Sequence, residues 1–227
     1  MVSMSFVDTE TTGLTPGIHR VIEVAVARVD DNRWEDFLIQ TYRIRPTLED
    51  YGRGEPRAYE VNGYRLGHPD WEEAPECDTP EATTVWGEIA ALLHRAPVVG
   101  YNTSFDTRHM WAELAKHGVL RVGGSTPYDG DDIKGSPWEG HQWDVAQFSK
   151  ALMKRAGRKG WKLSVVYEEI CKGPPLPPHR AEADVLRTLW VLADGRKAFP
   201  DMWPDVVVNE DAIKEAVTAW SERRLRG

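Results

Sequence analysis

The spacing of hydrophobic and polar positions predicts strands in the first part of the chain. A short apolar run from Met4 to Val7 leads directly into an acidic pair, and the valine-rich segment 21–29 and the loosely alternating segment 37–44 follow it. Apolar runs of this length, bounded by turn residues such as those at 12–17, are typical of β-strands. We therefore expect three consecutive strands in a meander, with a fourth, short and buried, at 98–101.

Helical spacing dominates after residue 79. Thr79 can cap a helix that has Pro80 at its first position, and apolar residues then recur every three or four positions until Pro97. Similar spacing predicts four further helices. The first ends at His117-Gly118, the second is capped by Asp144, the third stops at Gly173, and the fourth carries the apolar stripe of Leu186, Leu189, Trp190 and Ala193. A tail helix capped by Asn209 follows. This order of elements predicts a mixed sheet flanked by helices.

Two segments lack sustained periodicity. Residues 45–80 and 121–142 are rich in glycine, proline and acidic residues, and we expect both to be long loops. The proline-rich segment 173–178 must be extended, because proline fixes φ and pushes the preceding residue out of the helical region. This stiff segment presents His179.

Composition indicates a folded globular protein. Of the 227 residues, 41% are hydrophobic and 28% are charged. This length suits one core, and we assign a main domain to residues 1–199 and a helical tail to residues 200–227. The sequence shows neither a basic leader nor an apolar stretch long enough to span a bilayer, so the cytoplasm is the expected location.

Cysteine usage and net charge narrow the possible functions. Cys77 and Cys171 fit neither a zinc motif nor a disulfide framework, and we expect them to be packing residues. A formal net charge of −8 argues against a protein that coats long nucleic acid by charge alone. A protein that grips only a strand end through bound metal ions remains compatible with that charge.

Asp8 and Glu10 stand two positions apart at the end of the first predicted strand. Because a strand directs alternate side chains to one face, the two carboxylates should converge, with their Cα atoms roughly 7 Å apart. Such hard oxygen donors suit Mg²⁺ or Mn²⁺. About one residue in six is acidic, however, so this pair alone would more often be a solvated turn than a site.

Later residues could supply further ligands and a base. Asp106 follows the buried strand at 98–101, where sites form in mixed sheets, although a first-turn aspartate favoured by the helix dipole is an equal alternative. Asp184 projects away from the apolar stripe of its helix, and the small Ala181 and Ala183 permit close approach. His179 precedes that helix. A lone loop histidine is usually an ordinary polar residue, but beside a divalent cation it can act as a general base.

Taken together, these residues form three motifs of a known family. The sequences FVDTETTGL at 6–14, VGYNTSFD at 99–106 and HRAEAD at 179–184 resemble the motifs of the DEDDh branch of the DnaQ-like exonucleases, within the ribonuclease H-like superfamily. The second and third motifs have the cores N-x-x-x-F-D and H-x-A-x-x-D. The resemblance spans residues 4 to about 193 and implies an α/β fold, a mixed five-stranded sheet flanked by helices.

The resemblance also implies an activity and a site. Two divalent cations, Mg²⁺ or Mn²⁺, would be held by Asp8, Glu10, Asp106 and Asp184, and His179 would deprotonate the attacking water. The products would be nucleoside 5′-monophosphates released from a single-stranded or frayed 3′ end of DNA or RNA. Residues implied to bind the terminal nucleotide are Thr9, Thr11, Leu14, Asn102 and Phe105. The sugar preference, the strand preference, and a homodimer or polymerase partner stay open.

Some positions depart from the family pattern or carry a second interpretation. Asn62 replaces a usual histidine in the loop 58–63, which puts a substrate contact there in doubt. We interpret Asp144 as a helix cap, not a ligand. The basic residues Arg155, Arg158, Lys159 and Lys162 surround Trp161, which could stack on a base, although we expect burial in the core.

Two rival functions remain. A catalytically silent nucleic-acid-binding or replication scaffold subunit could keep this fold, although the loss of a ligand residue that would favour it is not seen. A metal-dependent hydrolase of small phosphodiesters or nucleotides is the second rival, and a comparison of mononucleotide esters with oligonucleotides as substrates would separate it from an exonuclease.

Overall fold

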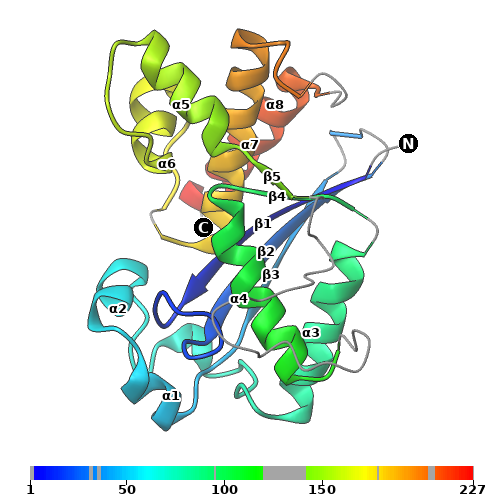
Figure 1. Ribbon diagram of the computed structural model, residues 1–227, viewed down its shortest axis with the longest axis vertical. Coiled ribbons are helices and arrows are strands. Elements are labelled where there is room, and N and C mark those ends of the chain that lie inside the picture. The colour runs from blue at the N-terminus through cyan, green and yellow to red at the C-terminus, as the bar shows by residue number, and fades with distance from the viewer. Residues whose placement is uncertain are drawn as a thin grey trace.

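A computed structural model describes residues 3–30, 33–34, 37–94, 96–119, 142–177, 179–203 and 208–226. Five strands form one sheet in the order β3-β2-β1-β4-β5, and helices cover both of its faces (Figure 1). The strands are β1 (Met4–Thr11), β2 (Val21–Val29), β3 (Leu38–Arg43), β4 (Val98–Gly100) and β5 (Gln142–Asp144). The expected mixed five-stranded sheet flanked by helices is confirmed.

The first three strands form the predicted antiparallel meander, whereas β4 and β5 run parallel to β1. The bounds of β2 match the valine-rich segment, since its side chains are buried on both faces of the sheet. The first strand continues through the acidic pair, four residues past the predicted Val7. The three-residue β5 had no pattern of its own in the sequence, because a strand of that length shows no periodicity.

Two hydrophobic cores lie on opposite faces of the sheet. Val24 and Val26 of β2 face the helices α3 (Pro80–Leu93) and α4 (Thr103–Lys116). The alternate residues Ala25 and Ala27 face the other core, which contains α5 (Ala146–Arg155), α7 (Ala181–Ala198) and α8 (Glu210–Arg226). Small side chains on that face allow α7 to pack close to the sheet. Buried side chains cover more of the surface of α7 than the predicted apolar stripe does, because α5, the sheet and α8 all contact this helix.

The segment 45–80 was predicted to be a loop, and that prediction is wrong in part. It contains α1 (Leu48–Arg53), α2 (Pro56–Asn62) and the 3₁₀ turn η1 (Pro69–Trp71). A third small core, formed by Ile22, Tyr64 and Trp71, holds these turns against β2. Helices of six or seven residues are too short to show a recurring hydrophobic period, so the sequence pattern missed them.

Most of the predicted helix ends are confirmed. Thr79 accepts a hydrogen bond from the Ala82 amide at the start of α3, and Asn209 accepts one from the Ala212 amide at the start of α8. The helix predicted to end at Gly173 is the short α6 (Leu163–Val165) continued as the π-helix η2 (Val166–Cys171). The predicted loop 121–142 lies outside the described residues, except for Gln142 in β5. None of the helices described here is long and apolar enough to cross a membrane.

The tail helix is joined to the main core. Ile213 and Val217 of α8 are fully buried against α7. A hydrogen bond from the Ser221 hydroxyl to the Pro175 carbonyl ties α8 to the extended proline-rich segment. The segment that presents His179 is therefore supported from behind by the tail.

Candidate active site

The first strand directs Asp8 and Glu10 toward α7. The cross-strand pairs Asp8–Ala25 and Glu10–Glu23 place both side chains on the face of the sheet that α7 covers. The period of two along the strand is therefore what brings the two carboxylates together, as predicted. In Figure 1 the arrowhead of β1 points past the start of α7 toward α2.

Asp184 reaches the same place from the first turn of α7. Ala181 and Ala183 are fully buried on either side of it, so the helix backbone approaches the sheet closely. Carboxylate oxygens of Asp8, Glu10 and Asp184 all lie within 4.8 Å of one another. Side chains separated by 176 positions thus form one cluster.

Asp106 approaches β1 from the other face, on the first turn of α4. Its Oδ1 atom accepts two hydrogen bonds from Thr9, one from the amide at 2.9 Å and one from the hydroxyl at 2.7 Å. The turn before α4 can come this close because residue 100 is glycine. A Cβ atom there would lie only 3.1 Å from the Val7 carbonyl oxygen.

Burial and mutual repulsion favour protonated carboxyl groups at this site. Burial, followed by repulsion from Asp106 and Asp184, raises the pKa of Asp8 well above its usual value. The pKa of Glu10 rises in the same way, with burial as its main cause. Burial raises the pKa of Asp106 to about 7 despite the Thr9 hydrogen bonds. Four crowded carboxylates with raised pKa values are the environment that bound cations neutralise, so this donor set fits hard divalent ions.

Arg187 organises the approach to Asp184, a role that no motif indicated. Its Nη1 atom donates to Asp184 Oδ1 at 2.5 Å and to the Pro177 carbonyl at 3.0 Å, while Nη2 donates to the Leu176 carbonyl at 2.6 Å. The guanidinium is almost fully buried. The guanidinium of Arg187 thus holds the Asp184 carboxylate and the segment leading to His179 in a fixed relation.

His179 lies at the exposed rim of the cluster. Its backbone has φ 48°, in the left-handed region that few non-glycine residues adopt. Burial raises the pKa of Asp184, and the nearby charges of Arg187 and, to a smaller extent, His179 lower it. The predicted base is therefore close enough to the carboxylates to influence them electrostatically.

Glu23 is a further acidic residue that the sequence analysis did not select. It is 1% exposed, lies opposite Glu10 in the sheet, and accepts a hydrogen bond from the Ala181 amide at 3.0 Å. Arg43 lies 3.2 Å from its other oxygen. Glu23 therefore caps the start of α7 and fixes that helix relative to β1. Its signal in the sequence was an acidic residue that interrupts the apolar run 21–27 of β2.

The residues predicted to bind the terminal nucleotide occupy different environments. Thr9 and Thr11 are buried, and their hydroxyls bond to Asp106 and to the Gly13 carbonyl. Leu14 is 69% exposed beyond the end of β1. Asn102 has a left-handed backbone before α4, and Phe105 packs on the His109 ring at 4.3 Å. Of these five, Leu14 and Asn102 are the exposed residues.

Two side chains next to the motifs have structural roles. The Asn62 amide donates to the Thr11 carbonyl, and its oxygen accepts from the Tyr64 amide, so this residue braces the end of β1. Asp144 Oδ1 accepts hydrogen bonds from the Ala146 and Asn102 amides. Asp144 ends β5 and the N-cap position of α5 is Val145, so the predicted cap lies one residue too early, although Asp144 still accepts from the first amide of the helix and from the turn that precedes α4.

Comparison with known proteins decides the family. The sequence profile of the RNase_T family, described as exonuclease, matches residues 5–192. The chain belongs to the RNase_T exonuclease family. This is the DnaQ-like DEDD group, so the resemblance seen in the motifs is confirmed. No curated protein gives a significant match.

Solved structures show the fold of this family member. Exonuclease I from Methylocaldum szegediense matches with a TM-score of 0.61 at 19% identity, over 89% of this chain and 42% of that one. The zinc-bound E. coli exonuclease I–ssDNA complex matches with a TM-score of 0.60 at 18% identity, over 90% and 42%. The ribonuclease H-like fold is therefore confirmed. The chain spans less than half the length of these exonuclease I structures.

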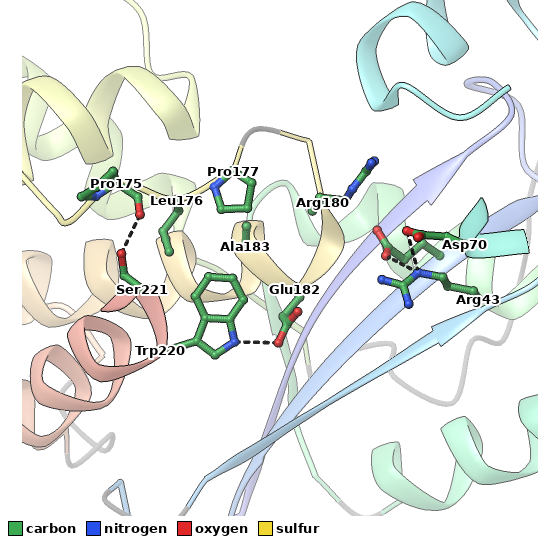
Figure 2. Close-up of a pocket in the computed structure, with 11 residues that line it drawn as sticks. Arg43, Asp70, Pro175, Leu176, Pro177, Arg180, Glu182, Ala183, Trp220 and Ser221 are labelled. Carbon is green, nitrogen blue, oxygen red and sulfur yellow. Dashed lines mark hydrogen bonds and ion pairs between the residues drawn. The ribbon is translucent and has the colours of Figure 1, made fainter. Parts of the chain in front are cut away.

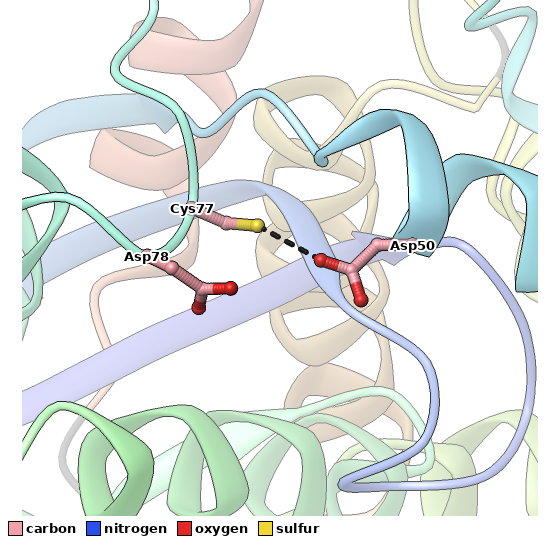
Figure 3. Close-up of side chains that lie close together, drawn as sticks. All are labelled: Asp50, Cys77 and Asp78. Carbon is pink, nitrogen blue, oxygen red and sulfur yellow. Dashed lines mark hydrogen bonds between the residues drawn. The ribbon is translucent and has the colours of Figure 1, made fainter.

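A second acidic cluster in this exonuclease-family chain is a salt-bridge network. Asp50, Cys77 and Asp78 lie together near α1 (Figure 3). Arg20 Nη1 bonds to both carboxylates at 3.0 Å, and Lys116 also pairs with Asp78. Burial raises the pKa of Cys77 to about 12, so its thiol stays protonated and donates to Asp50. Basic side chains already fill the place that a cation would take.

A cavity of about 670 Å³ lies behind the carboxylate cluster, between the first turn of α7, α8 and the β2–β3 edge (Figure 2). Arg43 and Arg180 lie on the sheet side of this cavity, where Arg43 pairs with Glu23 and Asp70. On the helix side, Trp220 Nε1 donates to Glu182 at 2.7 Å. Glu23 and Arg43 line this cavity, and Glu23 also accepts the hydrogen bond from the Ala181 amide at the start of α7. The Glu23–Arg43 pair therefore lies between the cavity and the carboxylate cluster.

The expectation that Trp161 is a core residue is wrong. Its side chain is 41% exposed. The basic residues predicted around it, Arg155, Arg158, Lys159 and Lys162, are exposed as well. The loop before α6 turns at Gly157 and Gly160, both with positive φ.

Proposed function

We propose that this chain is a 3′→5′ exonuclease that hydrolyses terminal phosphodiester bonds of nucleic acids and releases nucleoside 5′-monophosphates. The observation that carries the proposal is the convergence of Asp8, Glu10 and Asp184 within 4.8 Å, with Asp106 tied to the intervening Thr9. Membership of an exonuclease family supports this interpretation. In the complexes with oligonucleotides, single-stranded DNA is bound to exonuclease I itself, and we extend that class of ligand to this chain as part of the proposal.

Asp8, Glu10, Asp106 and Asp184 would hold two divalent cations, Mg²⁺ or Mn²⁺. Such ions neutralise the phosphate and lower the energy of both the attacking and the leaving oxygen. The raised pKa values of the carboxyls give the site a strong preference for bound positive charge.

His179 accepts the proton of the attacking water in this proposal. The new bond forms between the water oxygen and phosphorus, and the bond from phosphorus to the 3′ oxygen of the shortened strand breaks. The position of His179 at the exposed rim supports the role, because substrate and water reach it from solvent. Arg187 holds the preceding segment, so the imidazole starts from a fixed backbone.

Leu14 provides the proposed contact with the terminal base. It is exposed at the end of the strand that carries the metal ligands, where an apolar side chain can wedge against a base. Thr9, Thr11, Asn102 and Phe105 shape the backbone around that place in this proposal.

Digestion of 5′-labelled DNA and RNA oligonucleotides with Mg²⁺ or Mn²⁺ tests the function. We expect ladders that shorten from the 3′ end, and we expect EDTA and Asp8→Ala to abolish them. The matched control is Asp211→Ala, which removes an exposed carboxylate of α8 and should leave the ladder unchanged. Equal digestion by wild type and Asp8→Ala would reject the proposal. Cleavage of mononucleotide esters without any oligonucleotide ladder would favour the small-phosphodiester hydrolase instead.

A further inference from the structure

One short segment concentrates positive charge in an otherwise acidic chain. Between Lys150 and Lys162 the sequence has six basic residues and no acidic residue, against a net charge of −8 for the whole chain. Lys150, Lys154 and Arg155 lie on α5, and the others lie on the loop that leads to α6. All six are exposed. Such a local reversal of charge is the electrostatic footprint expected for contacts with phosphates.

An exposed aromatic ring stands within this basic segment. The Lys150 ammonium lies 4.4 Å from the centroid of the Trp161 ring. Arg158 pairs with Glu169 of η2, which steadies the base of the loop. An exposed ring next to several exposed basic side chains can contact both parts of a nucleotide, the face of its base and its phosphate.

Trp161 is anchored to the strand next to the catalytic one. The Tyr101 hydroxyl donates a hydrogen bond to the Trp161 carbonyl, and the two rings lie 6.3 Å apart. Tyr101 directly follows β4, which runs parallel to β1 in a register that pairs Phe6 with Val99. Continued by two residues, the same register places Asp8 of β1 beside Tyr101. Since neighbouring strands lie about 4.8 Å apart, the anchor is one strand away from the metal ligands.

We propose that Trp161 and the basic residues 150–162 form a binding subsite for single-stranded nucleic acid upstream of the terminal nucleotide. A base of the strand stacks on Trp161, and Lys150, Lys159 and Lys162 contact the adjacent phosphates. The subsite rests on the proposed exonuclease function, because the carboxylate cluster defines the end of the strand that it serves. Its connection to Tyr101 fixes the platform relative to that cluster.

The arrangement favours single strands over duplexes. A base can lie on the Trp161 ring only when its own face is free, and in a duplex each base is already stacked on its neighbours. DNA and RNA both offer the required base faces and phosphates.

Binding in an Asp8→Ala background measures the subsite without cleavage. Fluorescence anisotropy with a labelled single-stranded 12-mer should show about a tenfold weaker affinity for Trp161→Ala and near-complete recovery for Trp161→Phe. Lys159→Ala should lower the slope of log affinity against log salt by about 0.7. The control Lys197→Ala removes an exposed charge at the far end of α7 and should change neither quantity. DNA and RNA versions of the 12-mer identify the preferred sugar.

Length dependence provides the second readout. In the active chain, Trp161→Ala should lower the ratio of kcat/KM for the 12-mer over that for a dinucleotide by about tenfold. If Trp161→Ala binds the 12-mer as tightly as Trp161→Phe does, or if the parent chain binds no single strand, the subsite is overturned. If the parent chain shows no cleavage, and Trp161→Ala still weakens binding, the proposed activity fails and the subsite stands. A circular dichroism spectrum and melting curve identify any variant that fails to fold. If Trp161→Ala is such a variant, the salt dependence of Lys159→Ala carries the test, and a slope equal to that of the parent chain overturns the subsite.

Discussion

Arg187 Nη1 lies 2.5 Å from Asp184 Oδ1, and the same guanidinium donates to the carbonyls of Leu176 and Pro177. A single buried cation therefore links a proposed metal ligand to the segment that carries the proposed base. Arg187 lies three positions after Asp184 on α7, so their contact follows from helix geometry. The contacts with residues 176 and 177 exist only because the chain folds back on this helix.

Replacement of Arg187 should impair both stability and turnover. Arg187→Met keeps much of the side-chain volume but leaves two carbonyls and one carboxylate without their donor. Loss of one partner of a buried pair typically costs about 3–5 kcal/mol of unfolding free energy, which urea denaturation would measure. Arg53→Met removes an exposed pair with Glu49 and should cost less than about 1 kcal/mol. Equal losses for the two variants would contradict the role of Arg187.

The metal-free protein should become less stable as the pH rises toward 8. The pKa of Asp106 is about 7 in the folded chain, against an ordinary value of 3.8. The folded state thus holds its proton more tightly than the unfolded state. The stabilisation that this bound proton gives the folded state is fully present below a pH of 3.8, the ordinary pKa, and is lost as the pH rises through about 7. Denaturation in EDTA should show a lower free energy of unfolding at about pH 8 than at about pH 6.

The Asp106→Asn variant tests the cause of that dependence. Removal of the buried charge should raise the metal-free stability at about pH 8 by on the order of 2 kcal/mol and flatten the pH profile. Asparagine can still accept the Thr9 hydrogen bonds, so the local geometry should persist. Asp211→Asn, at an exposed position, serves as the control. A pH profile in Asp106→Asn as steep as in the wild type would show that other groups cause the dependence.

Glu23 and Arg43 should affect cation affinity in opposite directions. The negative charge of Glu23 raises the pKa values of Asp8 and Glu10 by repulsion, so it also favours a bound cation. Glu23→Gln keeps an acceptor for the Ala181 amide but removes the charge, and the apparent Kd for Mn²⁺ should rise several-fold. Arg43→Gln leaves Glu23 without its ion-pair partner and should lower that Kd. Calorimetric titration would measure both, and shifts in the same direction would contradict the electrostatic explanation.

His179→Ala should separate catalysis from cation binding. General-base catalysis contributes about 10²–10⁴-fold, so kcat should fall by a factor in that range. The increase in melting temperature on addition of Mg²⁺ should remain close to that of the wild type, because His179 is not among the proposed ligands. Asp184→Asn is the contrasting variant, in which both kcat and the shift in melting temperature should decrease. A normal kcat in His179→Ala would exclude it as the base.

Local patterns in the sequence determined much of this protein. The valine-rich run defined β2, Thr79 and Pro80 defined the start of α3, and alternation along β1 placed Asp8 and Glu10 on one face. These features depend on contacts within a few residues, which spacing and composition record directly. The three motifs then indicated the family, because each joins a structural element to a polar residue at a fixed position.

Contacts between distant segments were decided only by the tertiary structure. Glu23 caps a helix that begins 158 positions later, and Arg20 draws Asp50 and Asp78 into a salt-bridge network instead of a metal site. Trp161 is exposed on a loop that turns at two glycines and whose Trp161 carbonyl accepts a hydrogen bond from the Tyr101 hydroxyl. Hydrophobicity alone predicted the opposite. The physical reason is that side-chain spacing fixes which face a residue occupies on its own element, whereas packing of the elements fixes what that face meets.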